Sequence, residues 1–285
     1  MSDGQAHGAT RERAFPASVE KAYLEALATW NAPGEDGRIL EADRPLRRLQ
    51  ISLLLERVPE DGLVLDLGMG AGIIGHTLLR AGRRVAALDV PEADPEPADR
   101  LRELGADVLT AVVGPEPIPL ADGSVDAVFL GDVIEHVPGS PLPMLAEIHR
   151  VLRPGGHLVL TTPNAVRLHV RTKLLLGRSN WPPLDVVYGH TVHPSHHREY
   201  TGPDLVDVLT RSGFERIDVD YVEERLVTLP LNGLDDIATI ARRKPAEVGA
   251  ARRLVWGAAA RAARLLISAR PTLAGDIVVT ARRPS

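Results

Sequence analysis

The chain has 285 residues, of which 44% are hydrophobic, and 38 acidic against 33 basic side chains give a net charge of −5. It has no cysteine, which excludes disulfides, thiolate metal sites and a cysteine nucleophile. The acidic balance argues against nucleic acid as a partner, and no apolar run is long enough to predict a membrane span. The opening residues, MSDGQAHGATRERAF, lack the apolar stretch of a secretory signal, so we expect a cytoplasmic location.

Two amphipathic helices are expected ahead of the core. Apolar residues recur at helical spacing over residues 18–30 and again over residues 45–58. Turn-forming residues at 31–37 separate the two runs. We therefore expect residues 1–59 to form an N-terminal helical cap.

Strands and helices alternate through the middle of the chain. Apolar runs predict strands at 62–67, 84–90, 107–113, 125–131 and 157–162, with helices at 72–81, 97–105 and 141–152. This alternation predicts an α/β fold with a parallel sheet and right-handed crossovers.

The last third of the chain mixes regular and irregular segments. The pattern predicts a basic helical segment up to residue 176, a helix at 203–212, a strand at 214–222, helical residues at 235–269 and a final strand at 275–282. Between 176 and 203 lies a long irregular stretch, and such a stretch in a compact domain is usually functional. Five histidines lie in or near it: His169, His190, His193, His196 and His197.

A glycine-rich turn follows the first predicted strand. The sequence VLDLGMGAG places Gly68, Gly70 and Gly72 directly after a strand that carries Asp66. A strand that enters a helix through such a turn lets a ligand lie against bare backbone. The dinucleotide fingerprint needs its third glycine at position 73, where the chain has Ile73. This spacing disfavours a nicotinamide oxidoreductase.

Two acids flank this turn. Asp89 ends the second predicted strand, where a carboxylate is placed to accept both hydroxyls of a ribose. Asp66 would repel a pyrophosphate but would favour an ammonium group. Together the acids and glycines predict a pocket for a cationic, ribose-bearing nucleoside without phosphates.

Five segments in order carry a resemblance to a known family. They are VLDLGMGAG, VAALD, PIPLADGSVDAVFLGDVIEHV, LAEIHRVLRPGGHLVLTTPN and HHREYTGPDLVDVLTRSGFE. At these distances they resemble the motifs of class I S-adenosylmethionine-dependent methyltransferases, over residues 60 to 220. The resemblance implies a Rossmann-like doubly wound sheet of seven strands in the order 3-2-1-4-5-7-6, with the last strand antiparallel. It divides the chain into a methyltransferase core at 60–229, a helical insertion at 230–271 and a final core strand at 272–285.

The same resemblance implies S-adenosylmethionine as co-substrate. The residues expected to bind it are Asp66, Gly68, Met69, Gly70, Gly72, Asp89, Val90, Glu116 and Asp132. One position departs from the family pattern, because Pro115 stands where relatives usually carry an acid that recognises the adenine amino group. Adenine recognition would then fall to Glu116, Asp122 or the main chain.

Two interpretations of the segment from Asp132 to His136 stay open. In the first, Glu135 braces neighbouring backbone and His136 only lines the pocket. In the second, Asp132, Glu135 and His136 bind Mg²⁺, and a later histidine completes the site. The second is similar to the E-x-x-E-H pattern of ubiquinone-pathway O-methyltransferases, with Asp132 in place of the first glutamate. Such a metal would lower the pKa of a vicinal diol or a catechol.

The general base is expected among the histidines. The segment from His196 to Tyr200 resembles the H-x-x-x-F/Y motif that relatives place over the acceptor. A neutral imidazole suits proton removal near pH 7, so His196 and His197 are the first candidates and His136 the next.

The resemblance implies a methyltransferase for a small-molecule acceptor, with O-methylation of a sugar, phenolic or polyketide-like hydroxyl expected first. N-methylation of a small molecule and a non-catalytic S-adenosylmethionine-binding module are the alternatives. A homodimer is left open.

Overall fold

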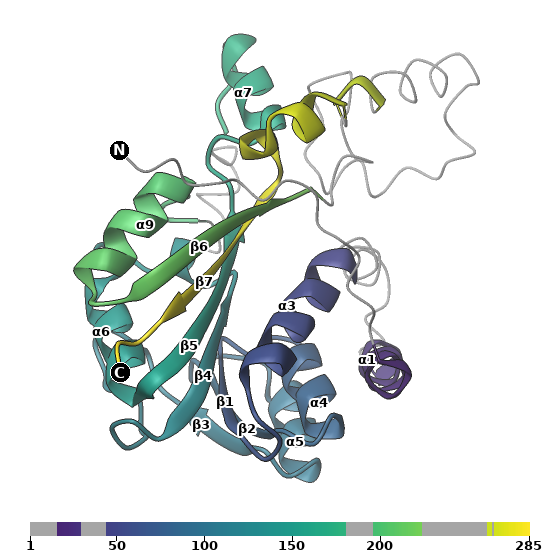
Figure 1. Ribbon diagram of the computed structural model, residues 1–285, viewed down its shortest axis with the longest axis vertical. Coiled ribbons are helices and arrows are strands. Elements are labelled where there is room, and N and C mark those ends of the chain that lie inside the picture. The colour runs from purple at the N-terminus through teal and green to yellow at the C-terminus, as the bar shows by residue number, and fades with distance from the viewer. Residues whose placement is uncertain (1–15, 30–43, 181–195, 224–260, 264) are drawn as a thin grey trace.

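The computed structural model describes residues 16–29, 44–180, 196–223, 261–263 and 265–285, apart from the side chain of residue 44. Within these residues, seven strands form one sheet in the order β3-β2-β1-β4-β5-β7-β6 (Figure 1). Strands β1 to β5 pair in parallel, and β7 runs antiparallel to both of its neighbours, β5 and β6. The predicted fold class, strand order and direction of the last strand are confirmed.

The strands are β1 (Leu63–Leu67), β2 (Arg84–Asp89), β3 (Asp107–Thr110), β4 (Val125–Gly131), β5 (Leu152–Pro163), β6 (Glu215–Val222) and β7 (Asp276–Arg282). Every residue of β1 is buried. A central parallel strand is covered on both faces, which explains why its sequence is a nearly continuous apolar run.

Two strands differ from the prediction. Strand β5 begins at Leu152, ahead of the Pro154-Gly155-Gly156 turn, and its register against β4 shifts between Val125 and Ala127. The extra residues of the turn therefore lie within β5, at this shift in register, and not ahead of the strand. Strand β3 ends at Thr110, three residues earlier than the predicted end at 113, because the chain turns there and the Glu116 carboxylate accepts a hydrogen bond from the Val112 N–H (3.0 Å).

The helices are α1 (Ala17–Thr29), α3 (Arg44–Arg57), α4 (Ile73–Arg80), α5 (Pro95–Glu103), α6 (Leu142–Val151), α7 (Leu168–Leu175) and α9 (Gly202–Arg211), with short 3₁₀ turns η1 (Ile134–His136) and η4 (Pro271–Leu273). Residues 261–263 and 265–269 are also helical. Local sequence fixes several starts: Asp94 caps α5 by accepting from the Glu96 N–H, and Thr201 with Asp204 forms a capping box on α9.

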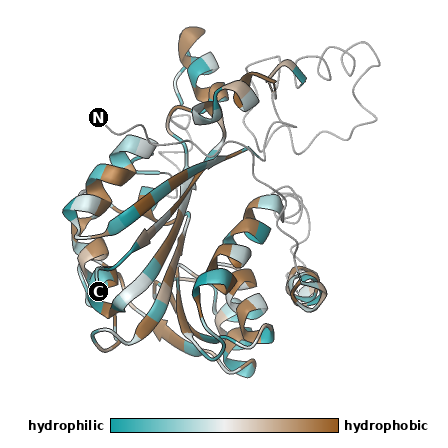
Figure 2. Ribbon diagram, viewed as in Figure 1, coloured by the Kyte–Doolittle hydropathy of each residue, from teal (hydrophilic) through white to brown (hydrophobic). Residues whose placement is uncertain are grey.

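Helices cover both faces of the sheet. Helices α6 and α9 lie on one face, and α3, α4 and α5 lie on the other (Figure 1). The strands between them are mostly apolar, whereas the outer helix faces carry hydrophilic residues (Figure 2). Helix α1 packs on α4, and Gln50 of α3 donates to the Thr161 hydroxyl of β5 (3.0 Å). The two predicted N-terminal helices are therefore confirmed, each within a residue or so of the expected bounds.

Parts of the expected organisation lie outside the described residues. They include the turn at 31–37, His190, His193 and most of the expected insertion at 230–271. The proposed domain boundaries stay predictions. No helix in the described part of the chain combines the length and the apolar character needed to cross a membrane.

Candidate functional site

A cavity of about 610 Å³ opens at the carboxyl ends of β1, β2 and β4. Its wall includes Gly68 after β1, Asp89 at the end of β2, and Asp132 after β4. In open α/β sheets ligands bind beyond the carboxyl ends of the strands, where the strand order reverses, and here the reversal lies between β1 and β4. The volume falls in the range of small-molecule sites, about 300–1,000 Å³.

Gly68 forms the floor of this cavity for two physical reasons. Its φ is +77°, a conformation that L side chains rarely adopt, and an added Cβ would lie 2.3 Å from Val133 Cγ2. Its N–H donates to the Leu88 carbonyl (2.8 Å), which ties the turn to β2. Glycine at this position therefore keeps the backbone bare where β1, β2 and the segment after β4 meet.

The Asp89 carboxylate is held by the glycine turn. One oxygen accepts from the Gly70 N–H (3.0 Å) and the other from the Val90 N–H (2.8 Å). Each oxygen keeps a second lone pair, so the fixed carboxylate retains the capacity to accept two hydroxyls from a ligand in the cavity that it lines.

Asp66 lies beneath the cavity rather than in its wall. Its side chain is only 1% exposed, and its Oδ2 accepts from the Gly75 N–H of α4 (3.1 Å). Burial raises the pKa of Asp66 to about 7, and the neighbouring charge of Asp89 adds to the rise. The carboxyl therefore links β1 to α4, and its expected interaction with the cofactor stays a prediction.

The other predicted cofactor residues divide into two groups. Val90 and Asp132 line the cavity. Met69 is buried among apolar side chains, Gly72 starts α4 beside a separate small pocket, and Glu116 caps the Val112 N–H as described above. Binding of the cofactor by the residues of either group stays a prediction.

Sequence reasoning missed the part of the cavity wall supplied by the segment after η1 and by the first turn of α6. Pro138, Ser140, Pro143 and Met144 line the cavity. The available signal was position alone, because this segment follows the carboxyl end of β4 and such segments border the ligand crevice.

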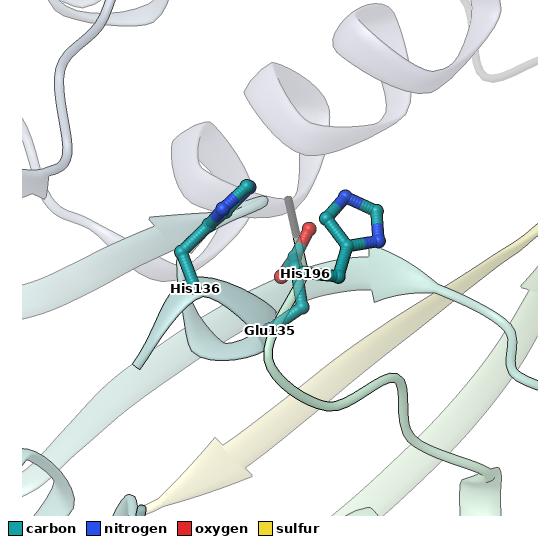
Figure 3. Close-up of side chains that lie close together, drawn as sticks. All are labelled: Glu135, His136 and His196. Atoms are coloured by element: carbon teal, nitrogen blue, oxygen red, sulfur yellow. The ribbon is translucent and has the colours of Figure 1, made fainter. Parts of the chain in front are cut away.

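The side chains of Glu135, His136 and His196 lie close together (Figure 3). The first two come from η1, and His196 comes from the loop before α9. One ligand atom from each lies within 4.8 Å of the others. His136 lines the cavity, and its ring meets the ring of His196 edge-on, with centroids 4.9 Å apart. The loop is fixed there because the His197 N–H donates to the Glu135 carbonyl (2.7 Å).

The electrostatic surroundings of the three side chains differ. Glu135 is fully buried and accepts from the Thr162 hydroxyl (2.9 Å); burial raises its pKa to about 7, and the charge of Asp132 adds to the rise. Burial lowers the pKa of His136, and the neighbouring His196 and His197 lower it further. A hydrogen bond with Glu199 raises the pKa of His196.

These residues do not fit the predicted Mg²⁺. Asp132 is not part of the group, and two imidazoles with one carboxylate differ from the oxygen-rich set that Mg²⁺ prefers. We therefore derive no step through a magnesium ion. The arrangement favours the interpretation in which Glu135 supports neighbouring groups, since its Oε2 accepts from Thr162, and in which His136 lines the pocket.

Tyr200 belongs to the core. It is 3% exposed and packs within the apolar cluster under α6 and α9. Its packing in the core therefore holds in place the loop that carries His196 and His197.

The strand order with an antiparallel seventh strand, together with a nucleoside-sized cavity over a glycine turn, defines the class I S-adenosylmethionine-dependent methyltransferase fold. Comparisons with known proteins agree. Residues 65–160 match the family model described as a methyltransferase domain. The chain belongs to the class I S-adenosylmethionine-dependent methyltransferases.

Similar proteins include a 37.1 kDa protein of transposon TN4556 from Streptomyces fradiae, 32% identical over 200 residues, covering 68% of this chain and 52% of that protein. A ubiquinone biosynthesis O-methyltransferase of Xanthomonas axonopodis pv. citri is 34% identical over 137 residues, covering 47% of this chain and 56% of that protein. The chain thus spans about half the length of these relatives. A crystal structure of a methyltransferase from Archaeoglobus fulgidus superposes with a TM-score of 0.50 at 18% identity, covering 83% of this chain and 94% of that one, which shows the fold alone.

Proposed function

We propose that this protein transfers a methyl group from S-adenosylmethionine to a hydroxyl of a small molecule. The observation that carries the proposal is the pairing of two features on one cavity: Asp89 fixed by the glycine turn on one side and His136, backed by His196, on the other. A sugar, phenolic or polyketide-like hydroxyl is the acceptor class. The similarity to a ubiquinone biosynthesis O-methyltransferase supports oxygen as the target atom.

Donor binding follows from the cavity wall. Asp89 would accept the two ribose hydroxyls, and the bare backbone at Gly68 would let the nucleoside lie close to the end of β1. The adenine would lie over the apolar residues that follow β3, including Ala111 and Val113. No phosphate-binding fingerprint is needed for this ligand.

The reaction needs little from the protein beyond alignment and proton removal. The methyl carbon of the sulfonium is already activated, so the acceptor oxygen forms the new C–O bond as the S–C bond breaks. The sulfur keeps the bonding electron pair and becomes the neutral thioether of S-adenosylhomocysteine. The hydroxyl proton passes to an imidazole, for which His136, His196 and His197 are the candidates. The N-terminal helices α1 and α3 would shape the acceptor side of the pocket, whereas most of the segment at 230–271, also expected to contribute, lies outside the described residues.

A methyl-transfer assay with a panel containing a catechol, a sugar and a primary amine tests this function. We expect S-adenosylhomocysteine to form together with a methylated hydroxyl compound, and we expect the rate to survive EDTA. Methylation of the amine alone would favour the N-methyltransferase alternative. Binding of S-adenosylhomocysteine without turnover on a broad panel would favour a non-catalytic module.

A further inference from the structure

A mostly buried ion pair, formed by Arg167 and Glu199, lies next to His196. The guanidinium of Arg167 binds the carboxylate of Glu199 through both of its terminal nitrogens, at 2.6 and 2.9 Å. The Glu199 Oε1 in turn lies 3.0 Å from His196 Nδ1. The side chains of Arg167 and Glu199 are only 12% and 14% exposed, so water screens their interaction weakly.

The sheet anchors this arrangement. Arg167 also donates to the carbonyl of Asn164 (2.9 Å), which lies at the end of β5. Asn164 is fully buried, and its side-chain amide donates to the carbonyls of Thr272 (3.0 Å) and Ala274 (2.9 Å). The Glu199 carboxylate therefore has a fixed position relative to the core, although it belongs to a loop.

This position decides which nitrogen of His196 carries the proton. A carboxylate only accepts hydrogen bonds, so the His196 Nδ1 that faces Glu199 must be the donor. In the neutral ring Nε2 then keeps its lone pair and is the atom that can take up a proton. The ring itself lies against His136, which lines the cavity.

We propose that Glu199, clamped by Arg167, is a positioning residue that sets the tautomer and orientation of His196, and that His196 is accordingly the general base. The assignment rests on the proposed function, because a base is required only if a hydroxyl is methylated. It selects His196 because the Nδ1 of this ring faces a carboxylate that Arg167 holds in place. Hydrogen bonds from Arg167 and His196 hold the pKa of Glu199 at about 2 against the effect of burial, so the carboxylate stays ionised through the working pH range.

Glu199→Gln is the decisive variant. The amide oxygen is expected to take the position of Oε2, which accepts from the nearer Arg167 nitrogen (2.6 Å) and from the Asn180 side-chain amide (3.5 Å). The amide NH₂ then takes the position of Oε1 and faces His196 Nδ1. The ring would then carry its proton on Nε2, the wrong nitrogen for a base. With a catechol as acceptor we expect kcat to fall by about 100-fold or more. The KM for S-adenosylmethionine should stay within about two-fold, because Glu199 is not in the cavity wall.

A second readout needs no turnover. Histidine ¹⁵N NMR of the ligand-free protein should show Nδ1 protonated and Nε2 unprotonated in the neutral ring of His196, and the reverse in Glu199→Gln. The pKa of His196 should also fall in the variant, since the hydrogen bond with Glu199 is the largest cause of its raised value. The other groups around this ring are Glu135 and His136 of η1, Arg167 ahead of α7, and the adjacent His197.

The control is Asp207→Asn, which makes the same carboxylate-to-amide change in the exposed pair with Arg211 on α9 and should alter neither readout. If Glu199→Gln does not fold, Arg167→Lys tests the clamp: it keeps the charge but loses the two-pronged geometry, and should lower kcat less while keeping the tautomer. An unchanged tautomer in Glu199→Gln would overturn the proposal, even with a lower kcat. If no hydroxyl is methylated but the tautomer switches, the proposed function fails while the positioning by Glu199 stands.

Discussion

At the scale of single residues, the cavity floor depends on the backbone at Gly68. Its positive φ and the nearby Val133 leave no room for a side chain. Gly82 has almost the same φ, +78°, but nothing lies within 4 Å of an added Cβ. The two glycines therefore separate the cost of backbone strain from the cost of a clash.

We expect Gly82→Ala to lower the free energy of unfolding by about 1–2 kcal/mol, the cost of a left-handed alanine. Gly68→Ala should lower it by roughly a further 1–3 kcal/mol, because Val133 must move. Urea denaturation of both variants measures the difference. The additional Val133→Ala change should recover part of the loss in Gly68→Ala, and equal losses in the two single variants would contradict the close contact.

The raised pKa of Asp66 predicts that the stability of the fold depends on pH. Its pKa is about 7 in the folded chain against an ordinary 3.8, so the folded state binds its proton more tightly than the unfolded state does. The stabilisation is complete below pH 3.8 and is lost as the pH rises through 7. From pH 5 to pH 8 this single group should lower the free energy of unfolding by roughly 2–3 kcal/mol.

Asp66→Asn should flatten that fall, since the amide oxygen can still accept from Gly75 while carrying no titratable proton. Denaturation of both proteins at several pH values between 5 and 8 supplies the comparison. Parallel curves for the two proteins would show that Asp66 titrates normally in the folded state.

The sequence predicts some of these residues and not others. Asp89 and Gly68 lie at the ends of strands that their own sequence defines, so their position at the cavity follows from strand order. The Arg167–Glu199 pair joins residues 32 positions apart, and its contact depends on how the loop before α9 lies against the end of β5. No local pattern reports that arrangement.

At the scale of elements, Asn164 joins β5 to the segment that leads into β7. Its buried amide satisfies two carbonyls, and its backbone N–H donates to the Gly275 carbonyl (2.9 Å). A buried carbonyl without a partner costs about 1–3 kcal/mol. The contact therefore helps to fix the antiparallel strand in place.

Asn164→Ala should lower the free energy of unfolding by about 1–3 kcal/mol, because the buried carbonyl of Ala274 and the part-buried carbonyl of Thr272 lose their donor. It should also weaken the support for Arg167. Ser124→Ala, which removes one exposed side-chain hydrogen bond, should change the stability by no more than about 0.5 kcal/mol. Chemical denaturation measures both, and equal effects would contradict the anchoring role.

Element bounds follow the sequence where one local signal dominates. Helix α9 begins within one residue of the predicted start at 203, and the apolar run of β1 is a strand. The start of β5 was not predictable, because Leu152 pairs with Val125 across an irregular register that depends on β4. Long-range pairing, rather than local propensity, sets that boundary.

At the scale of the whole molecule, the topology brings the proposed donor pocket and the proposed base together. The strand order reverses between β1 and β4, so the glycine turn and η1 border the same crevice. The antiparallel β7 lies beside β5, whose end holds Asn164 and, through it, the loop that carries His196. The proposed donor pocket and the histidine cluster thus adjoin, and His136 belongs to both.

Calorimetric titration with S-adenosylhomocysteine is the most direct test of this account. The wild-type chain should bind it, Asp89→Ala should weaken binding by about 10- to 100-fold because two hydrogen bonds to a charged acceptor are lost, and NAD should give no heat. A wild-type protein that shows no heat with S-adenosylhomocysteine, or an Asp89→Ala variant that binds it equally well, would contradict the assignment of this cavity to the methyl donor.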